Sequence, residues 1–274
     1  MEHFHHPFTV PERYGPTALD HAISAYAHDN GDALSWESLS ATATLVTTPD
    51  GSPIRSIITG RRHVTTGSYA SRKAGRGLPY ESMPERALFM QSEVDTDVVD
   101  YRAQPFRFES VVDGKKRIYI ADCVRLLSDG SIEVVEVKHD IGGLRDPDYA
   151  GKLQAVRLIC ERVGWRFRVM LQKPLRTSRG FEDIVDIQSW RFTDVSQSDI
   201  FCVASALDRN PMALGDLVDV LSQILPLGEG AARAVAMAKL KAMVVLRTVR
   251  FDLSKLLSLQ TPVTLVNDQP EIQQ

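Results

Sequence analysis

The sequence has little that would cross-link, anchor or export the chain. Its three cysteines are odd in number and far apart, with no Cys-x-x-Cys motif. This pattern argues against a disulfide scaffold and a thiolate zinc site, and it favours a reducing cytosol. The longest strongly apolar run, residues 240–246, contains Lys241 and is far shorter than the ~20 residues of a membrane helix. Residues 1–6 lack a basic segment followed by an apolar one, so we expect a cytoplasmic protein without a membrane anchor.

The chain also lacks a surplus of positive charge, since its formal net charge is −3. Two stretches are nevertheless basic. Residues 55–86 hold seven cations against two acids, and residues 229–255 hold six against two. Either stretch is suited to face a polyanion, although an ordinary solvated face is the alternative. The candidate DNA-binding residues in them are Arg72, Lys73, Arg76, Arg233, Lys239 and Lys241.

The 274 residues, 43% of them hydrophobic, are enough for one large or two ordinary domains. A Ser-x-Pro-Glu signature at Ser82 predicts a helix start. The elements that follow have the order α-β-β-β-α-β, which favours a mixed sheet covered by helices. They are the helix from 82 to 93, strands at 98–108, 117–127 and 132–138, a helix at about 149–163, and a strand at 165–171.

A second unit follows Pro174 and resembles a winged helix-turn-helix in its pattern. Its predicted helices span 198–208, 214–225 and 230–245, and its short strands span 247–251 and 262–266. We expect it to fold independently. Near the start of the chain, a helix at 17–28 and a strand at 40–47 are predicted. The expected division is an N-terminal segment of unclear role (1–67), a sheet domain (68–174) and a C-terminal domain (175–274).

Charged residues interrupt two of the predicted strands. Glu136 and Lys138 share one strand face because side chains alternate, and Asp122 lies on the strand before. We expect Asp122 to lie on an apolar row. That row consists of Ile118, Ile120 and Val124. Buried charges are costly unless they meet partners or a metal, so these three residues are candidates for chemistry.

The turn between these strands decides whether the two acids meet. A two-residue loop would pair Asp122 with Val137. A three-residue loop, with Gly130 in the left-handed conformation, pairs Asp122 with Glu136. Directly opposed Cβ atoms lie roughly 4.5–5.5 Å apart. Two carboxylates at that spacing repel unless a divalent cation joins them, and oxygen ligands suit Mg²⁺, with Mn²⁺ as a substitute.

Asp122 and Glu136-x-Lys138, with Glu85 on a preceding helix, resemble the PD-(D/E)xK nucleases. The closer resemblance is to the TnsA endonuclease subunit of heteromeric DNA transposases. It is carried by the segments 68–76, 80–86 and 97–105. The resemblance implies a restriction-endonuclease-like fold and the catalytic residues Glu85, Asp122, Glu136 and Lys138. It implies metal ligands at Glu85, Asp122, Glu136 and the Val137 carbonyl.

This resemblance also implies a function and partners. The chain would be a magnesium-dependent DNA endonuclease that cuts the 5′ ends of a transposon. An RNase H-type, TnsB-like transposase would cut and join the 3′ ends, and a TnsC-like AAA+ ATPase regulator would contact the C-terminal domain. Transposon-end DNA would be the substrate. The alternatives are a stand-alone restriction or repair nuclease of the same fold, and a non-catalytic DNA-binding assembly module.

Some of these residues also have a purely structural interpretation. Glu85 has the capping-box position relative to Ser82, which would occupy its carboxylate and leave Glu81 as the substitute ligand. Lys138 can be an ordinary strand-end charge. On the following helix, Lys152 and Gln154 are within reach of a phosphate, but a solvated helix face is the expected interpretation.

Overall fold

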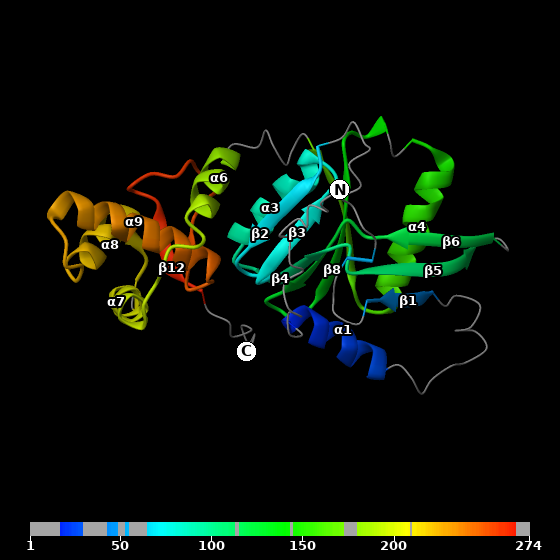
Figure 1. The fold of residues 1–274 in the computed structure, drawn as a ribbon, viewed down its shortest axis with the longest axis horizontal. Helices are drawn as coiled ribbons and strands as arrows, with labels where there is room; N and C mark the ends of the chain where they lie inside the picture. The colour runs from blue at the N-terminus through cyan, green and yellow to red at the C-terminus, as the bar shows by residue number, and fades with distance from the viewer. Residues whose placement is uncertain are drawn as a thin grey trace, which may run out of the picture.

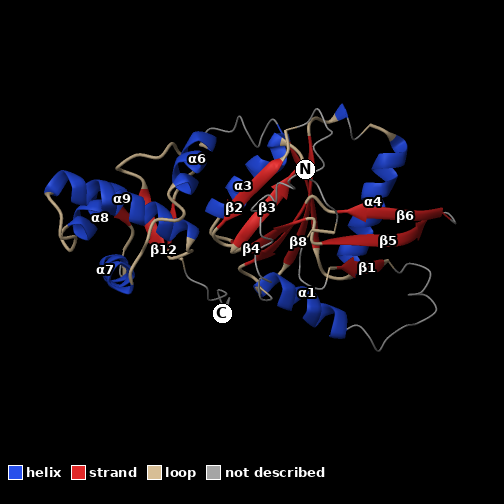
Figure 2. Cartoon of the chain, in the orientation of Figure 1, coloured by secondary structure: helices blue, strands red, loops and turns tan. Residues whose placement is uncertain are grey.

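The computed structural model describes residues 17–29, 43–48, 53–54, 65–112, 115–142, 145–172, 180–208 and 210–266. These residues form a mixed α/β lobe and a mainly helical C-terminal lobe (Figures 1 and 2). Within the described part of the chain, no helix is long and apolar enough to cross a membrane.

A four-stranded sheet forms the centre of the first lobe. Its order is β4-β7-β8-β9. The bounds are β4 Val98–Ala103, β7 Cys123–Leu127, β8 Ile132–Lys138 and β9 Arg166–Leu171. The pairs β4–β7 and β7–β8 are antiparallel, whereas β9 runs parallel to β8 after the crossover helix α4, Pro147–Arg162. With α3, Met83–Val94, in front of β4, the predicted α-β-β-β-α-β order is present.

Helices cover both faces of this sheet. Val124 and Val134 belong to a buried cluster with Leu153 and Val156 of α4. Cys123 and Val135 belong to a second cluster that includes residues of α3. On β7 and β8, even-numbered residues therefore face α4 and odd-numbered residues face α3. Helix α1, Ala18–Asp29, packs along the α4 side of the sheet and confirms the helix predicted there.

Two predicted strands are wrong as single strands, because each one is broken and passes into a second sheet. That sheet has the order β1-β5-β6, with bounds β1 Thr44–Thr47, β5 Phe106–Val112 and β6 Lys115–Ile120. The first break lies at Gln104 and Pro105. Gln104 has a φ of 46°, and Pro105 has no backbone N–H to donate to a neighbouring strand. The second break is at Asp122, whose carbonyl accepts from the Gln104 amide at 3.3 Å. Ile118 is 46% exposed, so the predicted apolar row does not continue through β6.

An unpredicted hairpin, β2 Gly67–Ser71 and β3 Arg76–Tyr80, packs on α3. It is held by Glu93, which is fully buried on α3. The Glu93 carboxylate accepts from the Ser71 hydroxyl at 2.7 Å, the Arg72 amide at 2.7 Å and the Tyr101 hydroxyl at 2.6 Å. These charge-assisted bonds fix the segment that contains the first basic stretch.

The C-terminal lobe contains the three predicted helices and two predicted strands. Their bounds are α7 Gln197–Leu207, α8 Leu214–Ser222, α9 Glu229–Val245, β11 Val249–Phe251 and β12 Pro262–Leu265. Two further elements, α6 Phe181–Ser189 and β10 Met212–Ala213, were not predicted. The small sheet has the antiparallel order β10-β12-β11. The winged-helix assignment stays a prediction.

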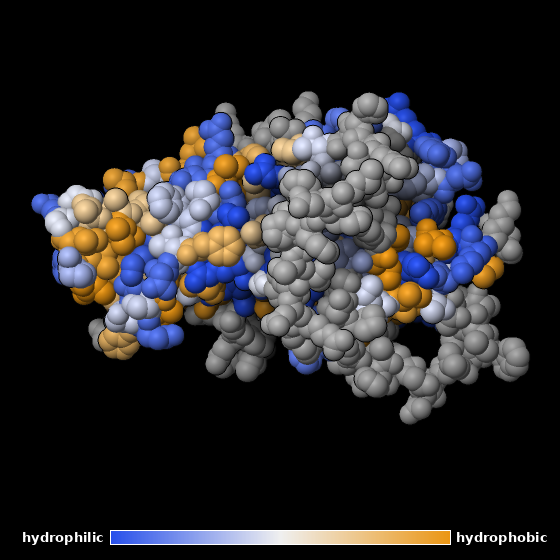
Figure 3. All heavy atoms as spheres, viewed as in Figure 1, coloured by the Kyte–Doolittle hydropathy of each residue, from blue (hydrophilic) through white to orange (hydrophobic). Residues whose placement is uncertain are grey.

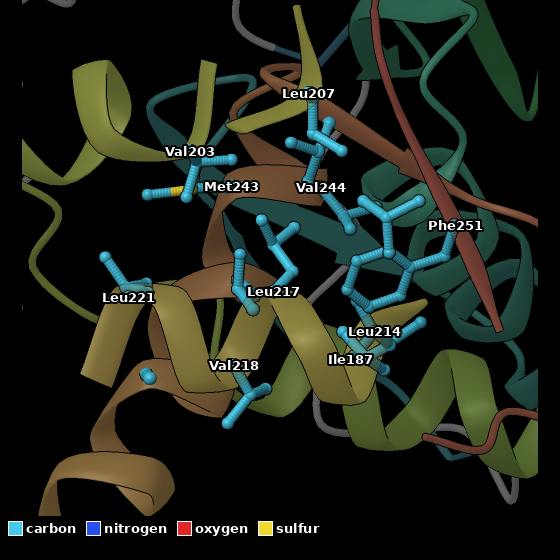
Figure 4. Packing of buried hydrophobic residues seen from close by; sticks show 14 of the residues in the cluster. Ile187, Val203, Leu207, Leu214, Leu217, Val218, Leu221, Met243, Val244 and Phe251 are labelled. Carbon is cyan, nitrogen blue, oxygen red and sulfur yellow. The ribbon is translucent and has the colours of Figure 1, made fainter. Parts of the chain in front are cut away.

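The core of this lobe lies between α8 and α9 (Figure 4). Leu217, Met243 and Phe251 are among its buried residues, and Val94 at the end of α3 belongs to the same cluster. The two lobes therefore share buried surface. Apolar residues also gather on the face shown over α8 and α9 (Figure 3), and the exposed large hydrophobic residues of the lobe include Phe201, Ile224 and Leu227.

Candidate active site

The turn between β7 and β8 has the predicted three-residue form. The Leu127 amide donates to the Ser131 carbonyl at 2.9 Å, and Gly130 has a φ of 81°. The ladder pairs Cys123 with Val135 at its open end. One step further, the register sets Asp122 opposite Glu136. Both residues are even-numbered, so both lie on the α4 side of the sheet.

Asp122 lies at the bend between the two sheets, half-buried. Its Oδ2 accepts from the Val137 amide at 2.8 Å. Burial and the neighbouring Glu136 carboxylate hold the pKa of Asp122 well above its usual value, although the Val137 bond opposes the shift. Two acids are thus held together without enough compensating positive charge.

Glu136 is 4% exposed and has a partner for each oxygen. The Tyr119 hydroxyl of β6 donates to Oε2 at 2.7 Å, and the Tyr149 hydroxyl of α4 donates to Oε1. Lys138 Nζ also lies 2.8 Å from Oε1. Burial, followed by the Glu136 charge, raises the pKa of Tyr119 well above its usual value, and the pKa of Tyr149 is raised with burial again the largest cause. Both tyrosines therefore stay protonated donors.

Lys138 shares the face of Glu136, as strand alternation predicts. Its ammonium lies 4.4 Å from the centre of the Tyr149 ring. The Lys138 side chain keeps 26% exposure, so it lies at the border between the buried carboxylate and solvent. A cation held there can meet a negatively charged group that approaches from solvent.

Glu85 lies at the start of α3, the helix that packs on the sheet face opposite α4. Its carboxylate accepts from the Ser82 hydroxyl at 2.8 Å and from the Glu81 amide at 2.9 Å. The Glu85 amide donates to Ser82 Oγ at 3.3 Å. The capping bonds between Glu85 and Ser82 are thus present, and they occupy the carboxylate that a metal would need. Glu85 is still near enough for its charge to contribute to the raised pKa of Asp122.

The comparison with protein families bears on this site. Residues 95–172 match the family described as TnsA-like endonuclease N terminal. The chain is TnsA-like in this region. The match confirms the resemblance seen in the sequence and supports a nuclease related to Tn7 transposition. A comparison with curated proteins gave no match.

The TnsA-like region includes Asp122, Glu136 and Lys138 but ends before the C-terminal lobe and begins after Glu85. Within the described residues, no three acidic, histidine or cysteine side chains lie close enough to form a ready metal cluster. The donor set is therefore a pair of carboxylates, and Glu85 is a further acid whose charge reaches Asp122. Oxygen donors with an uncompensated negative charge fit Mg²⁺ or Mn²⁺ better than softer metals.

Sequence reasoning missed the two tyrosines of the candidate site. Tyr149 fits the apolar spacing of its helix, so the pattern predicts a core residue and gives no sign that its hydroxyl bonds a carboxylate. Tyr119 precedes the strand break at Asp122, so its direction could not be derived from a continuous strand. A signal for Tyr149 was its position three residues before Lys152, on the same helix face.

The candidate DNA-binding cations of the first stretch have internal partners. The Arg72 guanidinium donates to the carbonyls of Arg191 and Thr193 at 2.6 and 2.9 Å. Lys73 Nζ donates to the carbonyls of Ser92 and Asp95 at the end of α3, at 3.0 and 2.6 Å. Such bonds neutralise the carbonyl end of a helix.

Arg76 is buried in β3. Three cations of this stretch, Arg55, Arg61 and Arg62, lie outside the described residues.

The candidate cations of α9 are paired with acids as well. Arg233 pairs with Asp219 and Lys239 with Asp199. Lys241 Nζ lies 2.6 Å from Asp186 of α6. DNA contact by these residues stays a prediction, and each would have to exchange its present partner for a phosphate.

Proposed function

We propose that the chain is the metal-dependent DNA endonuclease subunit of a heteromeric cut-and-paste transposase, and that it hydrolyses the 5′ ends of the transposon. The observation that carries the proposal is the meeting of Asp122, Glu136 and Lys138 inside the TnsA-like region. A non-catalytic module has no need to keep two acids so close that the pKa of one is raised.

The proposed metal is Mg²⁺, with Mn²⁺ as a substitute. Asp122, Glu136 and the Val137 carbonyl would hold it, and Glu85 would complete the shell after release from its capping bonds. When bound, the metal would lower the pKa of a bound water and offset charge that develops on the phosphate. The raised pKa of Asp122 supports this assignment, since a cation between the acids would remove the repulsion.

The protein groups around the pair have distinct proposed roles. Lys138, at the border with solvent, would orient the attacking water or stabilise negative charge on the scissile phosphate. Tyr119 and Tyr149 fix the Glu136 carboxylate from two elements, β6 and α4. Hydrogen bonds of this kind orient a ligand before the metal arrives.

Placement on DNA is proposed to come from partners. A TnsB-like transposase would bind the transposon ends, and a TnsC-like ATPase would contact the C-terminal domain. The net charge of −3 and the internal pairing of many cations support weak DNA binding by the chain alone. A bound partner would raise the local concentration of the nuclease at its site.

A metal-dependent nicking assay on transposon-end DNA tests this function. We expect slow cleavage by the purified chain in Mg²⁺ and efficient cutting at the 5′ ends when the TnsB-like partner is added. Asp122→Asn and Lys138→Met should reduce the cutting by at least about 10²-fold in both cases, whereas Arg157→Ala on the exposed face of α4 should not. Tight, sequence-specific double-strand cleavage by the chain alone would favour a stand-alone nuclease instead. No cleavage with any metal or partner would favour the non-catalytic module.

A further inference from the structure

A cavity of 210 Å³ lies between the β5–β6 hairpin and α4, next to the paired acids. In Figure 1 the hairpin crosses α4, and β6 contacts that helix. Among the residues around the cavity are Ser110 and Arg117 from the hairpin and Gly151 and Lys152 from α4. Tyr119 lines it too, and the hydroxyl of Tyr119 bonds Glu136. The cavity and the candidate active site therefore share a wall.

Two cations, Arg117 and Lys152, line the cavity. Within the part of the chain that the structure describes, neither Arg117 nor Lys152 forms an ion pair. Lys152 Nζ instead lies 5.6 Å from the centre of the Tyr119 ring. Burial lowers the pKa of Lys152, as do the charges of Lys138 and Arg117, while Glu136 opposes the shift. An exposed acid, Asp148, also lines the opening, so the cavity keeps a positive balance.

Neither cation is among the candidate DNA-binding residues of the two basic stretches, although the sequence already places Lys152 within reach of a phosphate. Arg233, Lys239 and Lys241 already have acidic partners. A phosphate that binds Arg117 or Lys152 breaks no ion pair and relieves repulsion among like charges. The position beside Glu136 and Lys138 also fits a strand whose phosphate reaches those residues.

The shape of the cavity suits a backbone segment rather than a free ligand. Its volume is below the roughly 300–1,000 Å³ of pockets that enclose a drug-sized molecule. Gly151 and Ala155 line the α4 side with small side chains, and a Cβ added at Gly151 would meet nothing within 4 Å. One part of a longer anionic chain can lie there while the rest continues past the opening.

We propose that this cavity binds the sugar-phosphate backbone of the DNA strand that enters the active site, with Arg117 and Lys152 each contacting a phosphate. The inference rests on the proposed nuclease function, and it assigns the DNA contacts to a cavity whose cations lie outside both basic stretches. Phosphate contacts of this kind position a strand without reading its sequence.

The salt dependence of DNA binding tests the proposal without any cleavage. Fluorescence anisotropy of a labelled transposon-end duplex is measured with the full chain in EDTA over a series of salt concentrations. For each phosphate that the protein no longer neutralises, the slope of log K against log salt should fall by about 0.9. Arg117→Ala and Lys152→Met should each reduce the slope by about that much, and the double variant by about twice as much.

Matched controls come from the same two elements. Lys116 is the neighbour of Arg117 on β6, is 65% exposed and pairs with Glu109. Arg157 is on α4, lies over the Phe167 ring and does not line the cavity. Lys116→Ala and Arg157→Ala should leave the slope unchanged. Circular dichroism and melting temperature should show that all four single variants are folded.

The outcomes separate this proposal from the proposed function. Three results would contradict the proposed binding of DNA in the cavity. They are unchanged slopes for Arg117→Ala and Lys152→Met, equal reductions of the slope in the two controls, or no measurable binding of the duplex at low salt. If the slopes fall as expected but no metal or partner supports cutting, DNA binding in the cavity is supported and the nuclease function is wrong. If the chain cuts DNA but Arg117→Ala and Lys152→Met leave the slope unchanged, the nuclease function is supported and the proposed DNA contact in the cavity is wrong.

Discussion

Asp122 and Glu136 face each other at the open end of the β7–β8 hairpin, where the Val137 amide donates to Asp122 Oδ2 at 2.8 Å. The bond anchors one acid to the strand that carries the other. Tyr119 and Tyr149 hold the second acid in turn. The pair is therefore fixed in the metal-free protein, and the repulsion between its charges is a cost of the folded state.

Replacing Asp122 with asparagine should separate activity from stability. The folded pKa of Asp122 lies above its usual value of 3.8, so the stability it contributes is present below about pH 4 and is lost as pH rises through the folded pKa. Asp122→Asn removes that loss and still accepts from the Val137 amide. We expect the metal-free variant to be about 1 kcal/mol more stable than wild type at pH 7, roughly 2–4 °C in melting temperature.

The same variant should lose cleavage by at least about 10²-fold, the scale of removing one group that acts on the transition state. Thermal melts at pH 4, 5.5 and 7 in EDTA give the stability comparison, and the nicking assay gives the activity. The stability difference should shrink towards pH 4. A variant that melts below wild type at pH 7 would show that Asp122 has a structural ionic role.

Removing the Tyr149 hydroxyl tests how Glu136 is positioned. Tyr149→Phe leaves Oε1 with Lys138 alone and keeps the ring beneath the Lys138 ammonium. Loss of a bond that orients a metal ligand typically costs 10–100-fold in affinity or activity. We expect the Mg²⁺ or Mn²⁺ concentration for half-maximal cleavage to rise about tenfold.

Tyr69→Phe is the matched control for that experiment, because it also removes a buried hydroxyl, which bonds Gln188 at 3.2 Å. It should leave the metal dependence of cleavage unchanged. An equal shift in both variants would mean that Tyr149 acts through general stability and not through Glu136.

The sequence predicted the site best where local chemistry decides the structure. A glycine at the third position of the turn favours the left-handed conformation, and this sets the register that brings Asp122 and Glu136 together. Strand parity then places Lys138 beside Glu136. Both rules depend on a few neighbouring residues, so one sequence is enough.

The strand breaks could not be found from apolar alternation, which continues across them. Val98–Ala103 and Phe106–Val112 are both apolar enough to be one strand, and only Pro105 signals the change of sheet. Asp122 carries no such signal, since its bend depends on pairing with Gln104. Contacts between distant segments decide these features.

Gly130→Ala should weaken the hairpin through its backbone alone. The φ of 81° is costly for a residue with a Cβ, whereas that Cβ would meet nothing within 4 Å. We expect a loss of about 1 kcal/mol in the free energy of unfolding. Urea denaturation measures it, and Gly130→Asn should lose less because asparagine tolerates this conformation.

Gly230→Ala in the first turn of α9 provides the opposite case. A Cβ at Gly230 also meets nothing within 4 Å, and its φ is not in the left-handed region. Alanine there should stabilise the protein by about 0.5–1 kcal/mol. Equal effects at the two glycines would show that the turn conformation does not restrict residue 130.

Val94 should couple the unfolding of the two lobes. It ends α3 in the mixed α/β lobe but packs in the cluster that contains Ile187, Val244 and Phe251. The Arg247 Nε donates to the Thr96 carbonyl at 2.9 Å across the same junction. The independent C-terminal domain that the sequence predicts stays a prediction, and these contacts across the junction give it a direct test. We expect a single calorimetric transition for the full chain.

Val94→Ala should lower that transition as a whole, with a loss of about 2 kcal/mol for the cavity it leaves. Leu158→Ala is the control, because Leu158 is 55% exposed on α4 and should change stability by less than about 0.5 kcal/mol. A fragment that ends at residue 174 exposes Val94 and should melt lower than the full chain. Two separate transitions, with Val94→Ala moving only one of them, would instead restore the independent C-terminal domain.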